Sequence, residues 1–354
     1  MKLLHVVGAR PNFPKVAPVF RAGVAAGLEQ AVVHTGQHYD DALSASFFRD
    51  LGLREPEINL EVGSLSHAVQ TARIMERFEP VLIKQAPDWV MVYGDVNSTV
   101  AAALTAAKLQ IPVAHIEAGL RSFDRTMPEE LNRIVTDQLA EQLYIHSPEA
   151  EDNLHAEGIP AERIHLVGNT MIDTLVALEG RFRSAGAAAK LGVGPGGFVL
   201  VTLHRPALVD GPLLAETVAR LAALARELPV VFPVHPRTRA MMESIEAEHP
   251  GLLLCEPLGY LDFLSLLADA RAVLTDSGGI QEETTYLGIP CFTLRANTER
   301  PITLTAGTNT LLGLDPAAIA KIPEALATRP AKPSEPPPLW DGHAAERIAE
   351  IIGA

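Results

Sequence analysis

The chain has 354 residues and a formal net charge of −14; 47% of its residues are hydrophobic and 20% are charged. The length suggests two domains, and the composition is that of a soluble globular protein with enough apolar residues for a sizeable core. The negative charge argues against nucleic acid or an anionic membrane surface as the main partner, and no apolar run is long enough to span a membrane.

In the first half of the chain, short apolar runs alternate with longer alanine-rich segments of helical period. This βαβα pattern predicts a parallel sheet with helices on both faces. The apolar run at the N-terminus is too short and wrongly flanked for a signal peptide, so we interpret it as the first strand. The predicted strands are residues 3–7, 31–35, 89–93, 113–116, 143–146 and 164–167, and the predicted helices include 98–108 and 131–140.

The pattern breaks at residues 183–197, which are rich in alanine, glycine and lysine, and then begins again. The sequence therefore predicts two doubly wound α/β domains, which we assign to residues 1–170 and 171–341. A proline-rich stretch at 329–338 leads to an amphipathic helix that could pack on either domain. The strands predicted for the second half are 198–202, 230–234, 252–255, 272–275 and 291–294.

Both cysteines, Cys255 and Cys291, lie in apolar segments of the second half. Cysteines in such segments are typical of buried free thiols, so a disulfide framework is not expected. Unpaired cysteines fit a reducing compartment, and we predict that the protein is cytoplasmic.

The segment Asp276-Ser277-Gly278-Gly279 follows the predicted strand 272–275 and opens a predicted helix. The backbone N–H groups in the first turn of a helix have no partner within the helix, and the helix dipole adds partial positive charge there. Glycine lets a ligand approach the backbone closely. The segment therefore predicts a local phosphate-binding loop, because the overall charge of an acidic chain cannot attract an anion.

Two acids follow sequential predicted strands: Asp95 comes after 89–93 and Glu117 after 113–116. Sequential parallel strands are usually neighbours, so the two carboxylates would lie at the edge of the sheet where ligands bind. Burial and like-charge repulsion would then raise the pKa of at least one of them, which suits acid/base catalysis. The alternative is that Asp95 caps the following helix and Glu117 pairs with Arg121, but we favour the functional hypothesis.

Glu129 is a third candidate acid. Thr126 and Glu129 also have the spacing of a helix capping box, which is the stronger interpretation from these residues alone. Arg10 and Lys15 follow the first predicted strand and could hold a phosphate between them. An equally good interpretation is that they form a surface turn and a helix cation.

Histidines end several predicted strands, namely His204, His235 and the pair Gln37-His38. A histidine in this position could contact a phosphate or a leaving group, but it is more often a polar loop residue. No His, Cys or Asp spacing matches a zinc or iron site, and the Walker, G-x-S-x-G and G-x-G-x-x-G motifs are absent. We therefore expect no metal and no cofactor.

With these residues in view, the chain resembles a known family, the non-hydrolysing UDP-N-acetylglucosamine 2-epimerases. The matching segments occur in the family's order over nearly the full length, and the two around Glu117 and Asp276 are long and specific. The matching segments are 8–11, 34–38, 93–95, 115–121, 127–133, 168–169, 276–283 and 298–301.

The resemblance implies two Rossmann-like domains facing a cleft, as in the GT-B glycosyltransferases, with the last helix, 342–354, returning to the first domain. It implies an isomerase that interconverts UDP-GlcNAc and UDP-ManNAc. In the family's proposed route, removal of the C2 proton and anti elimination of UDP give a 2-acetamidoglucal, to which UDP is added back. The resemblance also implies a homodimer whose product enters cell-surface polysaccharide synthesis.

Carried over residue by residue, the resemblance implies a role for each candidate and makes Glu129 catalytic instead of part of a capping box. The glutamate at position 283 would bind the ribose hydroxyls of UDP. The implied catalytic residues are Asp95, Glu117, Glu129 and His204, and the implied substrate-binding residues are Arg10, Lys15, His235, Ser277, Gly278, Gly279 and Glu283.

The chain departs from the family after the strand that ends near His204, because Pro206 stands where many members have a second arginine. Some members use this region to bind a second UDP-GlcNAc as an activator, together with residues near Gln37, His38 and Gln70. The departure puts such a second site in question here.

Four alternative functions stay open at this point. A related branch of the family acts on UDP-diacetamido uronic acids. A hydrolysing 2-epimerase or a GT-B glycosyltransferase would share the fold and the nucleotide site, although a glycosyltransferase needs no base at C2. A nucleotide-sugar sensor without catalytic activity would lack one of the three carboxylates, all of which this chain has.

Overall fold

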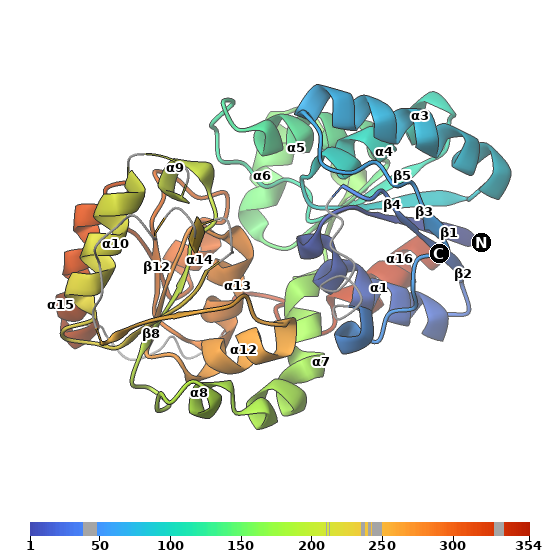
Figure 1. Ribbon diagram of the computed structural model, residues 1–354. Helices are drawn as coiled ribbons and strands as arrows, with labels where there is room; N and C mark the ends of the chain where they lie inside the picture. The colour runs from blue at the N-terminus through green and yellow to red at the C-terminus, as the bar shows by residue number, and fades with distance from the viewer. Residues whose placement is uncertain are drawn as a thin grey trace. The chain divides into compact units, whose positions relative to one another are not determined.

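The computed structural model describes residues 1–37, 48–209, 211, 213–234, 238–239, 242, 250–328 and 336–354. They form two compact units, the first comprising Met1–Ala177 and Pro338–Ala354 and the second Leu178–Pro337. Each unit contains one parallel sheet with helices packed on it, which confirms the predicted fold class (Figure 1). No helix in these ranges is long and apolar enough to cross a bilayer.

The first unit is built on a seven-stranded sheet in the order β3-β2-β1-β4-β5-β6-β7. Every neighbouring pair is parallel. The central strands are apolar on both faces, as a sheet covered on both sides requires. The strands are β1 (Lys2–Val7), β2 (Glu29–His34), β3 (Ile58–Asn59), β4 (Trp89–Tyr93), β5 (Val113–Ile116), β6 (Gln142–Ile145) and β7 (Ile164–Leu166).

Helices α3, α4 and α5 pack side by side in the first unit, with the alanine-rich α4 in the middle. Helices α5 and α6 begin with proline, which is favoured there because its missing N–H would have no partner within the helix. The helices are η1 (Arg10–Asn12), α1 (Phe13–Ala25), α3 (His67–Gln85), α4 (Asn97–Lys108), α5 (Pro128–Leu139), α6 (Pro148–Ala156), η2 (Ala161–Arg163), α7 (Thr170–Ala185) and α16 (Ala344–Gly353).

The last helix, α16, belongs to the first unit and packs against α1, as the red and blue ribbons of Figure 1 show. The carboxylate of Asp173 on α7 accepts hydrogen bonds from the backbone N–H groups of Ala344 (3.2 Å) and Ala345 (2.7 Å) and so caps α16. The buried indole of Trp340 donates to the carbonyl of His146 at 2.9 Å. These contacts attach the end of the chain to specific points of the first unit.

The second unit has a six-stranded parallel sheet in the order β10-β9-β8-β11-β12-β13. Its strands are β8 (Val199–Thr202), β9 (Val230–Pro233), β10 (Leu252–Cys255), β11 (Ala272–Thr275), β12 (Cys291–Thr293) and β13 (Asn309–Leu311). Its helices are α8 (Ala187–Lys190), α9 (Pro206–Val209), α10 (Leu213–Leu224), α12 (Tyr260–Asp269), α13 (Gly278–Leu287), α14 (Ile302–Thr305), η3 (Pro316–Lys321) and α15 (Ile322–Thr328).

All eleven predicted strands are present, with ends that differ by at most two residues. The sequence prediction missed β3 and β13, which lie at the edges of their sheets and contain only two and three residues. Each includes an asparagine, Asn59 or Asn309, which is unfavourable in strands and hides the pattern. The two units divide at Ala177, within α7.

Candidate active site

The strand order reverses direction once in each sheet, between β1 and β4 in the first unit and between β8 and β11 in the second. Ligands of open parallel sheets bind at the carboxyl ends of the strands at such a point. In the first unit, Arg10 follows β1, Asp95 follows β4, and Glu117 follows the adjacent β5. The candidate acids therefore lie at the edge of the sheet where a ligand is expected.

Glu117 adopts an unusual backbone conformation, with φ at 72°. This left-handed region disfavours residues other than glycine, and such strain often marks a functional position. The buried carboxylate of Glu117 lies 2.5 Å from the ammonium of Lys15, which is also buried. Lys15 thus contacts a candidate catalytic acid, and Arg121 pairs with Asp137 and Glu157.

Asp95 is held by Arg133, a residue of α5. The Nε and Nη2 atoms of Arg133 donate to one carboxylate oxygen of Asp95 at 3.0 and 2.7 Å. The side chain of Asn132 donates to the backbone carbonyl of Asp95 at 2.8 Å. The N-cap position of α4 is occupied by Val96 and not by Asp95, which does not support the alternative of a helix cap. Arg133 lies in a segment that matched the family, but nothing in the sequence pairs it with Asp95.

The sequence prediction also missed a buried ionic network behind β5. His115 contacts the carboxylate of Asp137 through Nδ1 (2.6 Å) and the carbonyl of Gly94 through Nε2 (2.8 Å). Asp137 also contacts Arg121 (2.7 Å), which pairs in turn with Glu157 (2.6 Å). Burial alone would raise the pKa of Asp137, but the nearby His115 and Arg121 outweigh burial and lower it. The network supports the turn that precedes Asp95.

Glu129 lies half-buried in the first turn of α5. The capping box predicted for this turn is absent, because the helix begins at Pro128 with Met127 as its N-cap. The hydroxyl of Thr126 instead donates to Asp124 at 2.6 Å. The predicted capping box therefore does not form, and Glu129 lies in the first turn of the helix.

Arg10 belongs to a loop that is attached to the end of β4. The carboxamide of Asn12 accepts hydrogen bonds from the backbone N–H groups of Gly8 and Ala9, both at 3.1 Å, and donates to the carbonyl of Tyr93 at 2.9 Å. The loop after β1 and the turn before Asp95 are thereby held together.

Gln37 and Gln70 are both buried, and their amide groups bond to the start of α4. The carbonyl oxygen of Gln37 accepts from the hydroxyl of Ser98 at 2.7 Å, and that of Gln70 accepts from Asn97 at 2.8 Å. These two residues thus hold the turn after Asp95. Two other predicted site residues, His38 and His235, lie outside the described residues.

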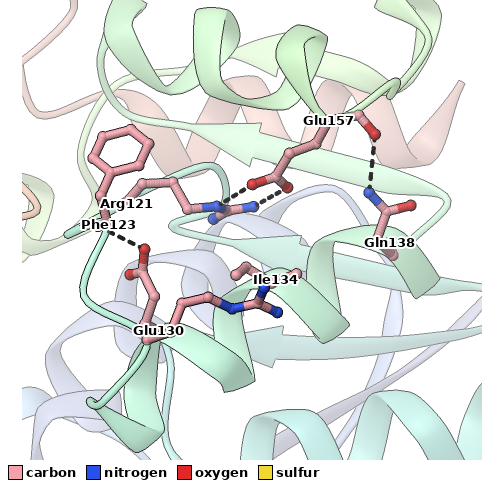
Figure 2. A pocket seen from close by; sticks show the side chains of 7 residues that line it. Arg121, Phe123, Glu130, Ile134, Gln138 and Glu157 are labelled. Carbon is pink, nitrogen blue, oxygen red and sulfur yellow. Dashed lines mark hydrogen bonds and ion pairs between the residues drawn. The ribbon is translucent and has the colours of Figure 1, made fainter.

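A pocket of about 390 Å³ lies beside α5 in the first unit. Figure 2 shows Arg121 and Glu157 paired on one side of it and Glu130 bonded to the backbone of Phe123 on the other. Asp95, Glu117 and Glu129 do not line this pocket. It is lined by Arg121, Phe123, Arg125, Glu130, Ile134, Gln138 and Glu157.

In the second unit, Asp276 joins the ends of β8 and β11. Its buried carboxylate accepts hydrogen bonds from the backbone N–H groups of His204 (2.9 Å) and Arg205 (2.8 Å). The imidazole of His204 lies 2.8 Å from the same carboxylate and is largely exposed. Burial raises the pKa of Asp276, but the His204 imidazole and the two backbone donors together lower it. Asp276 thus places His204 beside the predicted phosphate loop.

The predicted phosphate loop has the expected geometry. Helix α13 begins at Gly278, and its N-cap, Ser277, makes no side-chain cap. The first N–H groups of α13 therefore have no cap from Ser277 and can donate to an anion. A Cβ atom on Gly278 would collide with the guanidinium of Arg300 and lie 2.7 Å from a carboxylate oxygen of Glu299. The sequence prediction missed Arg300, whose guanidinium lies against Gly278 and pairs with Glu282 of α13 at 2.9 Å.

Glu283 is fully buried on α13. The hydroxyl of Tyr260 donates to its Oε1 at 3.0 Å, and its Oε2 has no hydrogen-bond partner among the described residues. Burial raises the pKa of Glu283 to about 8; the hydrogen bond from Tyr260 opposes this shift, and the charge of Glu282 adds to it. The unpartnered oxygen is suited to accept a hydrogen bond from a ligand hydroxyl.

Comparison with known proteins places these residues in a family. The sequence model for the UDP-N-acetylglucosamine 2-epimerases matches residues 23–353. The UDP-N-acetylglucosamine 2-epimerase of Methanocaldococcus jannaschii is 38% identical, with 99% of each chain covered. The UDP-2,3-diacetamido-2,3-dideoxy-D-glucuronate 2-epimerase of Pseudomonas aeruginosa is 41% identical, again with 99% of each chain covered.

A solved structure gives the same result in three dimensions. The crystal structure of the M. jannaschii UDP-GlcNAc 2-epimerase in complex with UDP-GlcNAc and UDP matches with a TM-score of 0.90 and 37% identity. The match covers 100% of this chain and 99% of that one.

Proposed function

Since the chain belongs to the UDP-N-acetylglucosamine 2-epimerase family, we propose that it interconverts UDP-GlcNAc and UDP-ManNAc without net hydrolysis. The observation that carries the proposal is the placement of Asp95 and Glu117 at the carboxyl ends of adjacent strands, each bonded to a buried cation. Such groups can take a proton from a carbon atom and return it.

The proposed reaction begins when a carboxylate of the first unit removes the proton on C2 of the sugar. The electron pair of that C–H bond forms the C1=C2 double bond, and the C1–O bond breaks with its electrons going to UDP. A carboxylic acid then returns a proton to the opposite face of C2, and UDP attacks C1 again. We propose that Asp95, Glu117 and Glu129 carry out these proton transfers.

We propose that the second unit holds UDP throughout this sequence. The backbone N–H groups of Ser277, Gly278 and Gly279 would donate to the diphosphate, and the imidazole of His204 would stabilise the negative charge on the leaving UDP. Arg10 would add a positive charge toward the diphosphate. The unpartnered oxygen of Glu283 would accept from the ribose hydroxyls.

Lys15 and the two glutamines need a revised proposal. Because Lys15 is buried against Glu117, we propose that it acts on this acid and reaches a phosphate only if the pair opens.

Because the amides of Gln37 and Gln70 bond to α4, and Pro206 replaces an arginine, we expect no activation by a second UDP-GlcNAc. Initial rates should then depend hyperbolically on UDP-GlcNAc concentration.

Incubation with UDP-GlcNAc in D₂O tests the main proposal. The expected product is UDP-ManNAc that carries deuterium at C2, detected by NMR and mass spectrometry. Accumulation of free sugar and UDP would instead favour a hydrolysing epimerase, and turnover only after addition of a sugar acceptor would favour a glycosyltransferase. The P. aeruginosa relative motivates a parallel assay with a UDP-diacetamido uronic acid.

We also propose a cytoplasmic homodimer whose product enters cell-surface polysaccharide synthesis. Exposed apolar side chains on α3 and α5, including Val69, Ile83, Leu131 and Val135, support an interface on this face of the first unit. Sedimentation should give the mass of a dimer, and Ile83→Glu should shift it to that of a monomer.

The proposed cytoplasmic location is supported by the two cysteines, which form no disulfide and so fit a reducing compartment.

A further inference from the structure

Helix α5 carries one candidate acid and holds another. Glu129 and Arg133 are four residues apart on α5, so their side chains lie on the same face of the helix. Arg133 donates two hydrogen bonds to one oxygen of Asp95, and the neighbouring Asn132 donates to the Asp95 backbone. The helix that presents Glu129 therefore also determines where Asp95 lies.

Arg133 is itself oriented by a second carboxylate. Its Nη1 atom donates to Glu130, and the arginine side chain is only 2% exposed. Glu130 is also buried and accepts from the backbone N–H groups of Ser122 (2.9 Å) and Phe123 (2.8 Å). Figure 2 shows the bond from the Phe123 backbone to Glu130. Phe123 has a φ of 58°, a conformation that needs such support. Glu130 thus connects the loop that follows Glu117 to the guanidinium that holds Asp95.

We propose that Arg133 is a positioning residue of the epimerisation, which fixes Asp95 relative to Glu129 and stabilises its charged form, and that Glu130 orients Arg133. This inference rests on the proposed function. Two N–H groups of one planar guanidinium restrict where a carboxylate can point, as a single flexible ammonium cannot. A neighbouring positive charge favours the ionised carboxylate, which is the form that can accept a proton.

The fixed geometry matters because proton transfer from carbon needs the base at a defined distance and angle. A displacement of about 1 Å in such a group can reduce a rate by about 100-fold. UDP binding has no such dependence on Arg133, since most of the proposed UDP contacts belong to the second unit and the one in the first unit, Arg10, lies in the loop after β1 and not on α5. Loss of Arg133 should therefore lower kcat and leave UDP affinity intact.

The test measures kcat, KM, UDP affinity and the pH profile for Arg133→Gln and Arg133→Lys. We expect kcat to fall by about 100-fold in Arg133→Gln and by about 10-fold in Arg133→Lys, which keeps the charge but loses the planar geometry. The Kd for UDP should stay within about twofold, because one lost charge in the first unit does not touch the proposed UDP contacts. The acidic limb of the kcat/KM profile should move to higher pH in Arg133→Gln and less in Arg133→Lys.

Arg347→Gln is the matched control, because Arg347 also pairs with a carboxylate of the first unit, Asp341, and bonds to the carbonyl of Val167. It should lower Tm without moving the pH profile. Glu130→Gln should reproduce the Arg133→Gln profile in a weaker form.

Two results would overturn the inference. Wild-type kcat and pH profile in Arg133→Gln would show that Asp95 needs no positioning by this residue. Equal losses of UDP binding and kcat, together with a lower Tm, would assign Arg133 a role in folding only. Failure of the wild-type protein to incorporate deuterium at C2 would instead reject the proposed function, and this inference with it.

Discussion

The two units differ in the partners that they give to the acids near the carboxyl ends of their strands. In the first unit, Asp95 and Glu117 each contact a buried cation, at 2.7 and 2.5 Å. In the second unit, Glu283 has only the hydroxyl of Tyr260, and burial raises its pKa to about 8. Asp276, also in the second unit, is buried as well, but the His204 imidazole and backbone N–H groups outweigh burial and lower its pKa.

Asp276 and Glu283, both buried in the second unit, show that the partners of an acid, and not burial alone, decide the direction in which its pKa shifts. Both sheets are parallel and both present these groups near the point where strand order reverses. A paired cation favours a charged acid, which suits proton abstraction, whereas burial with a neutral partner favours a protonated acid. The following experiments change an acid, one of its partners or the proposed phosphate loop, and measure whether chemistry or binding changes.

The largest effect is expected from Asp95→Asn in the first unit. An amide cannot accept a proton as a carboxylate does, so kcat should fall by about 10³-fold or more. The Kd for UDP should remain within about twofold, as calorimetry would show, because Asp95 is not among the proposed UDP contacts. Loss of UDP binding together with kcat would mean that Asp95 has a structural role.

Gly278→Ala should have the largest effect in the second unit. The new methyl group would collide with the guanidinium of Arg300 at the start of α13, where the proposed phosphate contacts lie. We expect UDP affinity to fall by about 10- to 100-fold, which corresponds to about 1.4–2.8 kcal/mol. Gly194→Ala is the control, because a Cβ atom there has nothing within 4 Å. Equal UDP affinities in the two variants would contradict a binding role for the loop at Gly278.

The pH dependence of UDP binding should follow Glu283. A hydroxyl donor favours the carboxylate, so UDP affinity should rise with pH up to about 8 and fall below it by at most about tenfold per unit. The stability of the ligand-free protein should change in the opposite sense. Because burial raises the pKa of Glu283 from 4.5, protonated Glu283 contributes to the stability of the folded protein at low pH, and this contribution is lost as pH rises through about 8.

Glu283→Gln separates this dependence from the titration of UDP itself. The variant should bind UDP with a pH dependence that reflects the ligand's phosphate alone. If wild type and variant titrate in parallel from pH 6 to 9, Glu283 does not change its protonation when UDP binds.

The smallest effect is expected from Tyr260→Phe. Removing the hydroxyl takes one donor from Glu283, so its pKa should rise further and UDP affinity at pH 7 should fall about three- to tenfold. Tyr144→Phe is a matched control, because the buried hydroxyl of Tyr144 has no hydrogen-bond partner among the described residues. An unchanged Kd in Tyr260→Phe would show that the hydroxyl does not influence UDP binding.

Sequence patterns predicted the strands well, because a buried parallel strand is a continuous apolar run. They also predicted where Asp95 and Glu117 lie, because the first polar residues after such a run mark the carboxyl end of the strand. They did not predict the partners of those acids. Arg133 reaches Asp95 across 38 residues of sequence, and His115 reaches Asp137 across 22. Such pairs depend on how helices pack on the sheet, and no local spacing encodes them.

The place of α16 has a consequence for how the protein is made. Proteins are synthesised from the N-terminus, so every residue of the second unit emerges from the ribosome before α16 does. Until then, the nascent first unit lacks the side chains of Trp340, Ile348 and Ile352, which are buried in the finished protein. The unit that carries the three candidate acids is therefore the first to be started and the last to be completed.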